Sequence, residues 1–249
     1  MGTNEFSLDG SVAVVTASGE AWLVDMALAL AEVGARVVVT GRPESVIDAA
    51  ALAVQQTGRE AVAVPANLLS ERDVAKMVRQ VLKDMGNISV LINTFNFEFW
   101  KPFLQIKTKE WKQVFNTNVT ANFLCTRQIG RHMVARKKGS IVNVTSGLAQ
   151  RGLSNGAAYC SSMGSVLQMT RALALEWANL QVRVNAVGVG WVQGPTKSEG
   201  KDPLVGYIPM RRRAVIEDII PLIIFLASEA SSYLSGNIYM VDGGLMARG

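Results

Sequence analysis

Short runs of β-branched and other apolar residues alternate with longer segments of helical periodicity along the whole chain. Most of the short runs lack polar alternation, which is typical of parallel strands buried on both faces. The longer segments have the length that a helical crossover connection needs. The pattern therefore predicts a doubly wound α/β fold, in which a central parallel sheet of about seven strands has helices on both faces.

No linker or internal repeat interrupts this alternation, so residues 1–249 are expected to form a single domain. The predicted strands cover residues 12–16, 36–40, 61–64, 90–93, 140–145, 182–187 and 238–241. The predicted helices cover residues 21–33, 44–57, 71–85, 108–136, 157–178 and 216–228.

Composition and charge exclude several classes of protein. Hydrophobic residues make up 49% and charged residues 18% of the chain, as expected of a domain with a large buried interior. The most apolar run, 214–227, contains charges and a proline and is shorter than the roughly 18 residues of a membrane helix. The net charge of +5 is concentrated at 136–138 and 211–213 without interleaved aromatic residues, which favours a solvated surface over nucleic-acid binding. Residues 1–10 do not resemble a secretion signal, and a cytoplasmic location is expected.

The sequence offers little support for a metal site or for histidine and cysteine chemistry. No cluster of His, Cys, Asp and Glu has the spacing of metal ligands, so no catalytic metal is expected. His132, the single histidine, is interpreted as structural, which argues against a histidine-based triad. Cys125 and Cys160 have no redox spacing and are expected to be inert thiols in a reducing compartment.

Polar residues follow several of the predicted strands, where ligands bind in sheets of this kind. Ser146 ends the segment 139–146, Tyr159 follows thirteen residues later at the start of a helix, and Asn118 lies within 115–120. These residues resemble the active-site serine, tyrosine and asparagine of the short-chain dehydrogenase/reductase family. Three further segments share the resemblance, which covers essentially the whole chain: 183–185, 190–192 and 225–244.

This resemblance implies a Rossmann-like fold and NADP(H)-dependent carbonyl reduction of a small, apolar carbonyl compound. It implies that Tyr159 is the proton donor, that Ser146 orients the carbonyl and that Asn118 supports the site. A homo-oligomer, dimer or tetramer, is also implied. Arg42 follows the second strand, where an arginine suits the 2′-phosphate of NADP. The candidate cofactor contacts are Thr16, Ser18, Gly19, Arg42, Asn67, Asn93 and Gly190.

The glycine-rich loop of the family is altered in this chain. Ala17, Ala21 and Leu23 occupy its three glycine positions, and Glu20 adds a negative charge where phosphate would bind. Phe95 replaces a smaller residue after the fourth strand. Two interpretations stay open: a distorted phosphate cradle, or an ordinary strand-to-helix turn that holds no nucleotide.

The Tyr-x-x-x-Lys pair of the family reads Tyr159 and Met163 here. A cation about 5 Å from the phenol, at an effective dielectric of about 20, is worth about 3 kcal/mol, or about two pKa units. Without that cation Tyr159 is expected to be mostly neutral at pH 7, which favours reduction over alcohol oxidation. The alternative interpretation of Met163 is flexible filling of the core.

Three functions therefore remain open from the sequence. The first is an NADP(H)-dependent carbonyl reductase that uses Tyr159, Ser146 and Asn118. The second is a cofactor-independent enzyme that uses Ser146 and Tyr159 for proton transfer or cyclisation. The third is a non-catalytic relative that acts through oligomer assembly. The segment 196–207, which by resemblance caps the substrate pocket, indicates no substrate class.

Overall fold

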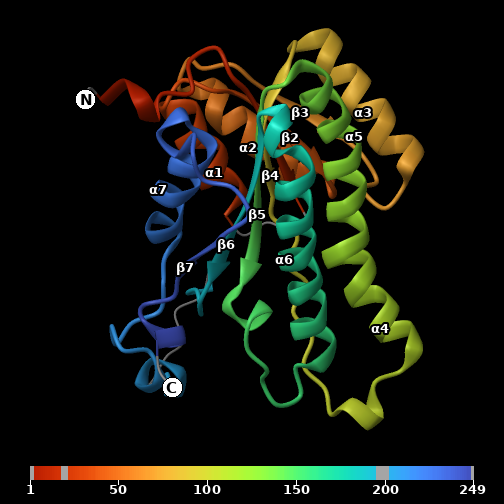
Figure 1. The fold of residues 1–249 in the computed structure, drawn as a ribbon, viewed down its shortest axis with the longest axis vertical. Coiled ribbons are helices and arrows are strands. Elements are labelled where there is room, and N and C mark those ends of the chain that lie inside the picture. Colours follow the sequence, from red (N-terminus) through yellow and green to blue (C-terminus); the bar gives the residue numbers. More distant parts are fainter. Residues whose placement is uncertain (1–2, 18–21, 195–201, 248–249) are drawn as a thin grey trace.

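The protein folds around one parallel β-sheet, as the sequence predicts. The computed structural model describes residues 3–17, 22–194 and 202–247. Within these residues the strands follow the order β3-β2-β1-β4-β5-β6-β7 and every neighbouring pair is parallel (Figure 1). The strands are β1 (Val12–Ala17), β2 (Arg36–Gly41), β3 (Ala61–Pro65), β4 (Ile88–Asn93), β5 (Gly139–Ser146), β6 (Val182–Val189) and β7 (Ile238–Val241).

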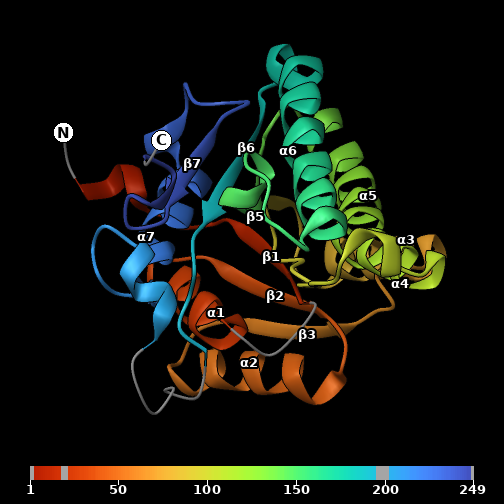
Figure 2. The same cartoon turned by 90° about the horizontal axis from the view of Figure 1, so that it is seen from below.

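Helices cover both faces of this sheet, which makes a three-layer sandwich (Figure 2). One face packs against α1, α2 and α7, and the other packs against α3, α5 and α6. None of the described helices is both long and apolar enough to cross a membrane. The helices are α1 (Leu23–Glu32), α2 (Glu44–Gln56), α3 (Glu71–Asp84), α4 (Thr108–Phe115), α5 (Ala121–Arg136), α6 (Ala157–Trp177) and α7 (Ile216–Ala227).

Strand β1 shows why the strands lack polar alternation. Ala13 and Val15 pack into the core shared with α1, α2 and α7. Val12 and Val14 point the other way, into the core shared with α3 and α5. Successive side chains point to opposite faces, and because both faces are covered, most positions along the strand are apolar.

The predicted helix over residues 108–136 is wrong in one respect. The structure divides it into α4 and α5, which a π-helical turn over Asn116–Thr120 joins. Such a turn widens the helix by one residue, and hydrophobic periodicity does not reveal it. The turn holds the buried side chain of Asn118.

A buried polar network joins the sheet to α5 and α6 near the carboxyl ends of β4 and β5. The amide of Asn93 donates to Asn143 Oδ1 at 2.9 Å and to Thr126 Oγ1 at 3.0 Å. Asn143 donates in turn to Thr170 Oγ1 at 2.9 Å. Because a buried polar group is costly when unsatisfied, these bonds fix how the two helices sit on the strands that carry the site.

Candidate active site

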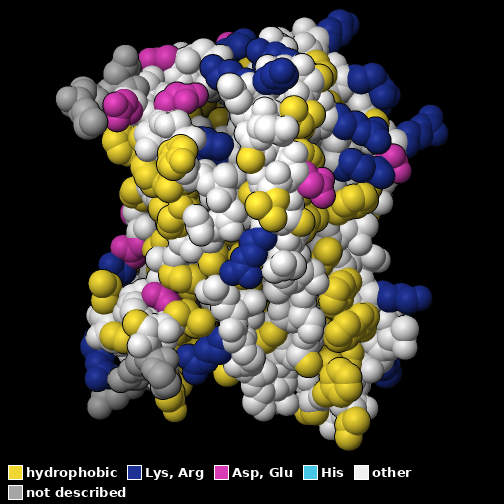
Figure 3. Space-filling view, viewed as in Figure 1, with side chains coloured by type: hydrophobic (Ala, Val, Ile, Leu, Met, Phe, Trp, Pro, Cys, Tyr) yellow, Lys and Arg dark blue, Asp and Glu magenta, His cyan; other side chains and the backbone are white. Residues whose placement is uncertain are grey.

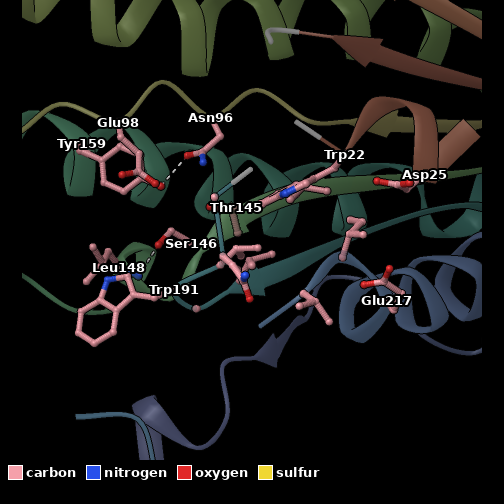
Figure 4. Close-up of a pocket in the computed structure, with 18 of the residues that line it drawn as sticks. Trp22, Asp25, Asn96, Glu98, Thr145, Ser146, Leu148, Tyr159, Trp191 and Glu217 are labelled. Atoms are coloured by element: carbon pink, nitrogen blue, oxygen red, sulfur yellow. Dashed lines mark hydrogen bonds between the residues drawn. The ribbon is translucent and has the colours of Figure 1, made fainter. Parts of the chain in front are cut away.

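A cavity of about 840 Å³ opens where β1, β4, β5 and β6 end (Figure 4). Its size is that of a small-molecule site, and its position is the one expected for a ligand in a doubly wound sheet. Tyr159 and Ser146 both line it. The other described lining residues are Trp22, Asp25, Asn96, Glu98, Trp100, Val144, Thr145, Leu148, Val189, Gly190, Trp191, Val192, Gln193, Gly194, Val215, Ile216 and Glu217.

Tyr159 lies in the first turn of α6 and is 3% exposed. Its hydroxyl donates to Asn96 Oδ1 at 2.6 Å, and its ring centroid is 5.5 Å from that of Trp100. Burial raises the pKa of the phenol, the charge of Glu98 raises it further, and a hydrogen bond with Ser146 partly opposes them. The phenol is therefore neutral at physiological pH and has a proton to give.

Ser146 is the last residue of β5, so the strand itself aims its side chain at the cavity. Its Oγ accepts the backbone N–H of Leu148 at 3.2 Å, which orients the hydroxyl. Figure 4 draws Ser146 and Tyr159 on the same side of the cavity. The structure thus brings these two predicted hydroxyls together on one wall of the cavity.

Asn118 is fully buried and does not line the cavity in the described structure. Its Oδ1 accepts the N–H of Phe97 at 2.7 Å, and its Nδ2 donates to Phe97 O at 3.1 Å and to Ser162 Oγ at 2.9 Å. Ser162 lies in α6 and donates to the carbonyl of Tyr159 at 2.7 Å. Asn118 therefore holds the loop after β4 against the helix that carries Tyr159.

Met163 lies one turn after Tyr159 on α6 and is 1% exposed. The hydroxyl of Thr145 donates to its sulfur at 3.3 Å. The side chain fills space beneath the cavity wall and brings no charge to the site. The two interpretations of Met163 are compatible: the side chain leaves Tyr159 without a neighbouring cation, and it also fills space in the core.

Asn96 is a site residue that the sequence analysis did not single out. It lies three residues after the end of β4, and its Oδ1 accepts a hydrogen bond from the Tyr159 hydroxyl. The contact spans 63 residues of chain and could not be read from local pattern.

The structure places the candidate cofactor residues in different surroundings. The side chains of Thr16 and Asn93 are fully buried, and Thr16 Oγ1 donates to Ile92 O at 3.4 Å. Arg42 and Asn67 are exposed, and Arg42 pairs with Glu44 at 3.0 Å. Gly190 lines the cavity, and a Cβ on it would lie 2.7 Å from the Cα of Asp242, so no larger residue fits. Ser18, Gly19 and Ala21 lie outside the described residues, and Ala17 ends β1.

Two of the bulky replacements lie away from the cavity. Leu23 begins α1 and is 3% exposed in the core formed with α2 and α7. Phe95, also 3% exposed, packs in the opposite core with α3 and α5. Neither side chain lines the cavity, because the local backbone turns each Cβ toward the interior of the domain. The direction of a side chain, more than its size, decides whether it blocks a site.

The remaining reactive side chains lie outside the cavity lining. His132 lies on α5, and burial lowers its pKa. Cys125 is buried, which raises its pKa to about 12, and both it and Cys160 are unpaired. Within the described ranges no three His, Cys, Asp or Glu side chains are grouped so as to hold a metal ion.

Comparison of the whole chain with known proteins identifies its family. The family model described as enoyl-(acyl carrier protein) reductase matches residues 17–246. A 3-oxoacyl-[acyl-carrier-protein] reductase from Synechocystis is 32% identical over 243 residues, which cover 96% of this chain and 98% of that protein. The chain belongs to the short-chain dehydrogenase/reductase family. It is an oxidoreductase of that type.

Sugar-acid enzymes are also among its relatives. A 5-keto-D-gluconate 5-reductase from Escherichia coli is 30% identical over 247 residues, covering 97% of both chains. The crystal structure of a gluconate 5-dehydrogenase from Burkholderia cenocepacia, in complex with NADP and tartrate, superposes with a TM-score of 0.93. That structure is 25% identical, and the match covers 99% of both chains. The similarity is consistent with carbonyl reduction or alcohol oxidation and spans more than one substrate class.

The cavity has the size of a small-molecule site and the position that a dinucleotide takes in sheets of this kind, and its described lining holds no cation for the phosphates. The cavity runs from Trp22 and Asp25 at the start of α1, past Gly190, to Tyr159. A helix N-terminus offers backbone N–H groups to phosphate, although Asp25 opposes that charge. A Cβ on Gly190 would lie against Asp242, so this position requires glycine for the packing behind the cavity wall.

Proposed function

We propose that this protein is an NADP(H)-dependent carbonyl reductase in which Tyr159 donates a proton and Ser146 binds the carbonyl oxygen. The observation that carries the proposal is the buried, neutral phenol of Tyr159 beside Ser146 on the wall of an 840 Å³ cavity. The NADP-bound structure of the similar gluconate 5-dehydrogenase supports the choice of nucleotide.

The nucleotide, when bound, supplies a hydride to the carbonyl carbon. Tyr159 transfers its proton to the carbonyl oxygen, so that the ketone becomes an alcohol and the resulting phenolate takes a proton from solvent. Before this transfer the Tyr159 hydroxyl must turn from Asn96 toward the substrate. Ser146 keeps the oxygen within reach, and Asn118 keeps the loop after β4 in register with α6. Gly190, the start of α1 and Arg42 would hold the nucleotide.

The acidic lining of the cavity argues against a sugar acid as the substrate. The gluconate and 5-keto-gluconate named for the relatives are carboxylates, and Glu98, which lies beside Tyr159 where the substrate would bind, would repel them. An uncharged or cationic carbonyl compound fits this charge pattern better.

Calorimetric titration with NADPH and NADH tests the nucleotide first, and NADPH consumption over a panel of ketones and aldehydes tests the reaction. We expect micromolar NADPH binding, weaker NADH binding, and loss of at least about 100-fold in kcat in Tyr159→Phe. Tyr233→Phe, at a fully exposed tyrosine, is the matched control. Absence of NADPH binding at millimolar concentration would contradict the proposal.

Two other functions remain as outcomes of this test. Met163 and the lack of a cation among the described lining residues favour chemistry without a nucleotide, which product formation in the absence of NADPH would reveal. If neither NADPH consumption nor product formation without NADPH is detected, a non-catalytic role in oligomer assembly is favoured.

We further infer that the chain acts in the cytoplasm as a dimer or tetramer. Its two unpaired cysteines suit a reducing compartment. Large apolar side chains are exposed near α4, with Phe103 at 64% and Leu104 at 96%. Figure 3 shows apolar side chains gathered at the end of the molecule where α4 lies. Exposed apolar surface of this kind favours contact with another subunit.

A further inference from the structure

The described lining of the cavity carries negative side chains and no positive ones. Asp25, Glu98 and Glu217 contribute three carboxylates, while no lysine, arginine or histidine is among the described residues that line it. Figure 4 draws Glu98 at the Tyr159 end of the cavity and Asp25 and Glu217 at the other end. At the Tyr159 end the carboxylate of Glu98 attracts a cationic substrate and repels an anionic one.

Aromatic side chains from separate loops lie on the same walls. Trp22, Trp100 and Trp191, three of the five tryptophans in the chain, line the cavity together with Tyr159. The rings of Trp100 and Tyr159 are tilted by 51° with their centroids 5.5 Å apart. Figure 4 shows Trp191 on the same side of the cavity as Tyr159 and Ser146. Faces of this kind attract an organic cation through the negative potential of their π electrons.

Glu98 places a carboxylate within this aromatic group. Its Oε2 accepts the indole N–H of Trp100 at 3.4 Å, and Figure 4 draws its side chain beside Tyr159. Burial and, second, the charge of Glu98 disfavour the phenolate of Tyr159, which raises the pKa of that phenol. A cation bound here would relieve this unfavourable electrostatic interaction.

The charge of Arg213 interacts weakly with that of Glu98, and the guanidinium is already engaged by other groups. Its Nε donates to Asp202 Oδ2 and its Nη1 to Val192 O at 3.3 Å. The pair with Asp202 is the main cause, and Glu98 a minor one, of the raised pKa of this guanidinium. Because Arg213 does not line the cavity, Glu98 keeps a face toward the ligand space.

We propose that the Tyr159 end of the cavity binds a carbonyl compound that carries an ammonium group next to its carbonyl, held by Glu98 and the faces of Trp100 and Trp191. The inference rests on the proposed function for the carbonyl and adds the charge class of the substrate. The ammonium group supplies the positive charge that Met163 does not, and it stabilises the developing alkoxide beside Ser146.

A matched set of three ketones tests the charge class. Acetonyltrimethylammonium carries the cation, 4,4-dimethylpentan-2-one replaces its nitrogen by carbon, and 4-oxopentanoate carries a carboxylate. Titrations that follow tryptophan fluorescence and heat, at constant ionic strength, give the three dissociation constants without turnover. We expect the cation to bind at least about tenfold more tightly than its neutral isostere, and the anion more weakly than both.

Variants then locate the binding determinant. In Glu98→Gln and in Trp100→Leu the ratio of cationic to neutral affinity should fall by about tenfold. Glu60→Gln, at an exposed carboxylate outside the cavity lining, is the matched control and should keep the ratio. Equal affinity for the cation and its isostere, or an unchanged ratio in Glu98→Gln, would overturn the inference.

The same ketones, assayed with NADPH, separate this inference from the proposed function. Cation-selective binding without NADPH consumption would support the proposed charge class of the ligand and contradict the proposed reductase activity. Reduction of the neutral ketone with a kcat/KM equal to or above that of the cationic ketone would support the reductase activity and contradict the proposed charge class of the substrate.

Discussion

Tyr159 lies in surroundings that favour its neutral form, and under the proposed function this makes it a proton donor. The ring is buried, Glu98 is nearby, and the turn that would carry a lysine carries Met163. A base must lose its proton before it acts, whereas an acid must keep it, so these surroundings suit reduction.

The pH dependence of the reductase should reflect the raised pKa of Tyr159. The unperturbed phenol titrates at about 10, and a raised pKa keeps the proton in place up to and beyond that pH. We therefore expect no loss of kcat/KM from deprotonation of Tyr159 between about pH 6 and 9. In Glu98→Gln the alkaline limb of the kcat/KM profile should move to lower pH, because the charge of Glu98 no longer raises the pKa of Tyr159. Spectrophotometric titration, as a difference against Tyr159→Phe, measures this pKa directly; an alkaline limb that stays in place would contradict the assignment.

Restoring a lysine at position 163 tests whether a nucleotide site is latent. We expect Met163→Lys to bind NADPH at least about tenfold more tightly, because an ammonium group one turn from Tyr159 adds positive charge near an anionic nucleotide. The same change should lower Tm, because Met163 is 1% exposed and an ammonium group there loses hydration. Calorimetry and thermal unfolding give both values, with Met163→Leu as the size-matched control. A lower Tm with unchanged NADPH affinity would count against a latent site.

Among the elements, the π-helical turn between α4 and α5 has the most direct influence on the site. It turns Asn118 inward, where the amide bridges the loop after β4 and α6 through three hydrogen bonds. The loop carries Asn96, Glu98 and Trp100, and the helix carries Tyr159, so one side chain sets the spacing between two walls of the cavity.

Removal of that side chain should destabilise the fold measurably. In Asn118→Ala the N–H and carbonyl of Phe97 and the hydroxyl of Ser162 lose a buried partner, which should lower the free energy of unfolding by about 2 to 3 kcal/mol. Asn116→Ala, an exposed position in the same turn, should change it by less than about 0.5 kcal/mol. Urea unfolding followed by circular dichroism measures both; equal effects would show that the bridge contributes little.

At the scale of the whole molecule, the parallel sheet brings the ends of β1, β4, β5 and β6 to one edge, and the cavity forms there. The exposed apolar surface of Phe103 and Leu104 near α4 lies outside this cavity, and the proposed reaction gives it no role. Assembly with further copies of the chain would bury it.

A charge introduced into that surface should weaken assembly. We expect Leu104→Glu to raise the dissociation constant of the oligomer at least about tenfold, because a buried carboxylate without a partner is unfavourable in an interface. Leu52→Glu, at a half-exposed leucine on α2, is the control. Analytical ultracentrifugation over a range of concentrations measures the shift. A monomeric parent protein, or equal effects of the two substitutions, would contradict the proposed interface.

The sequence by itself determined the fold class and three of the residues that line the cavity: Ser146, Tyr159 and Gly190. All seven strands lie where apolar runs predict them, with ends that differ by at most two residues, because most positions of a strand covered on both faces are apolar. Ser146 and Tyr159 could be placed together, since each follows a recognisable strand or begins a helix.

Only the tertiary structure decided which side chains share the cavity. Leu23 and Phe95 turn into the core, while Asn96 and Trp100 reach Tyr159 across about 60 residues of chain. Periodicity reports which face of its own element a residue occupies. It does not report how a loop without periodicity turns its side chains, because those directions are set by packing between segments distant in sequence.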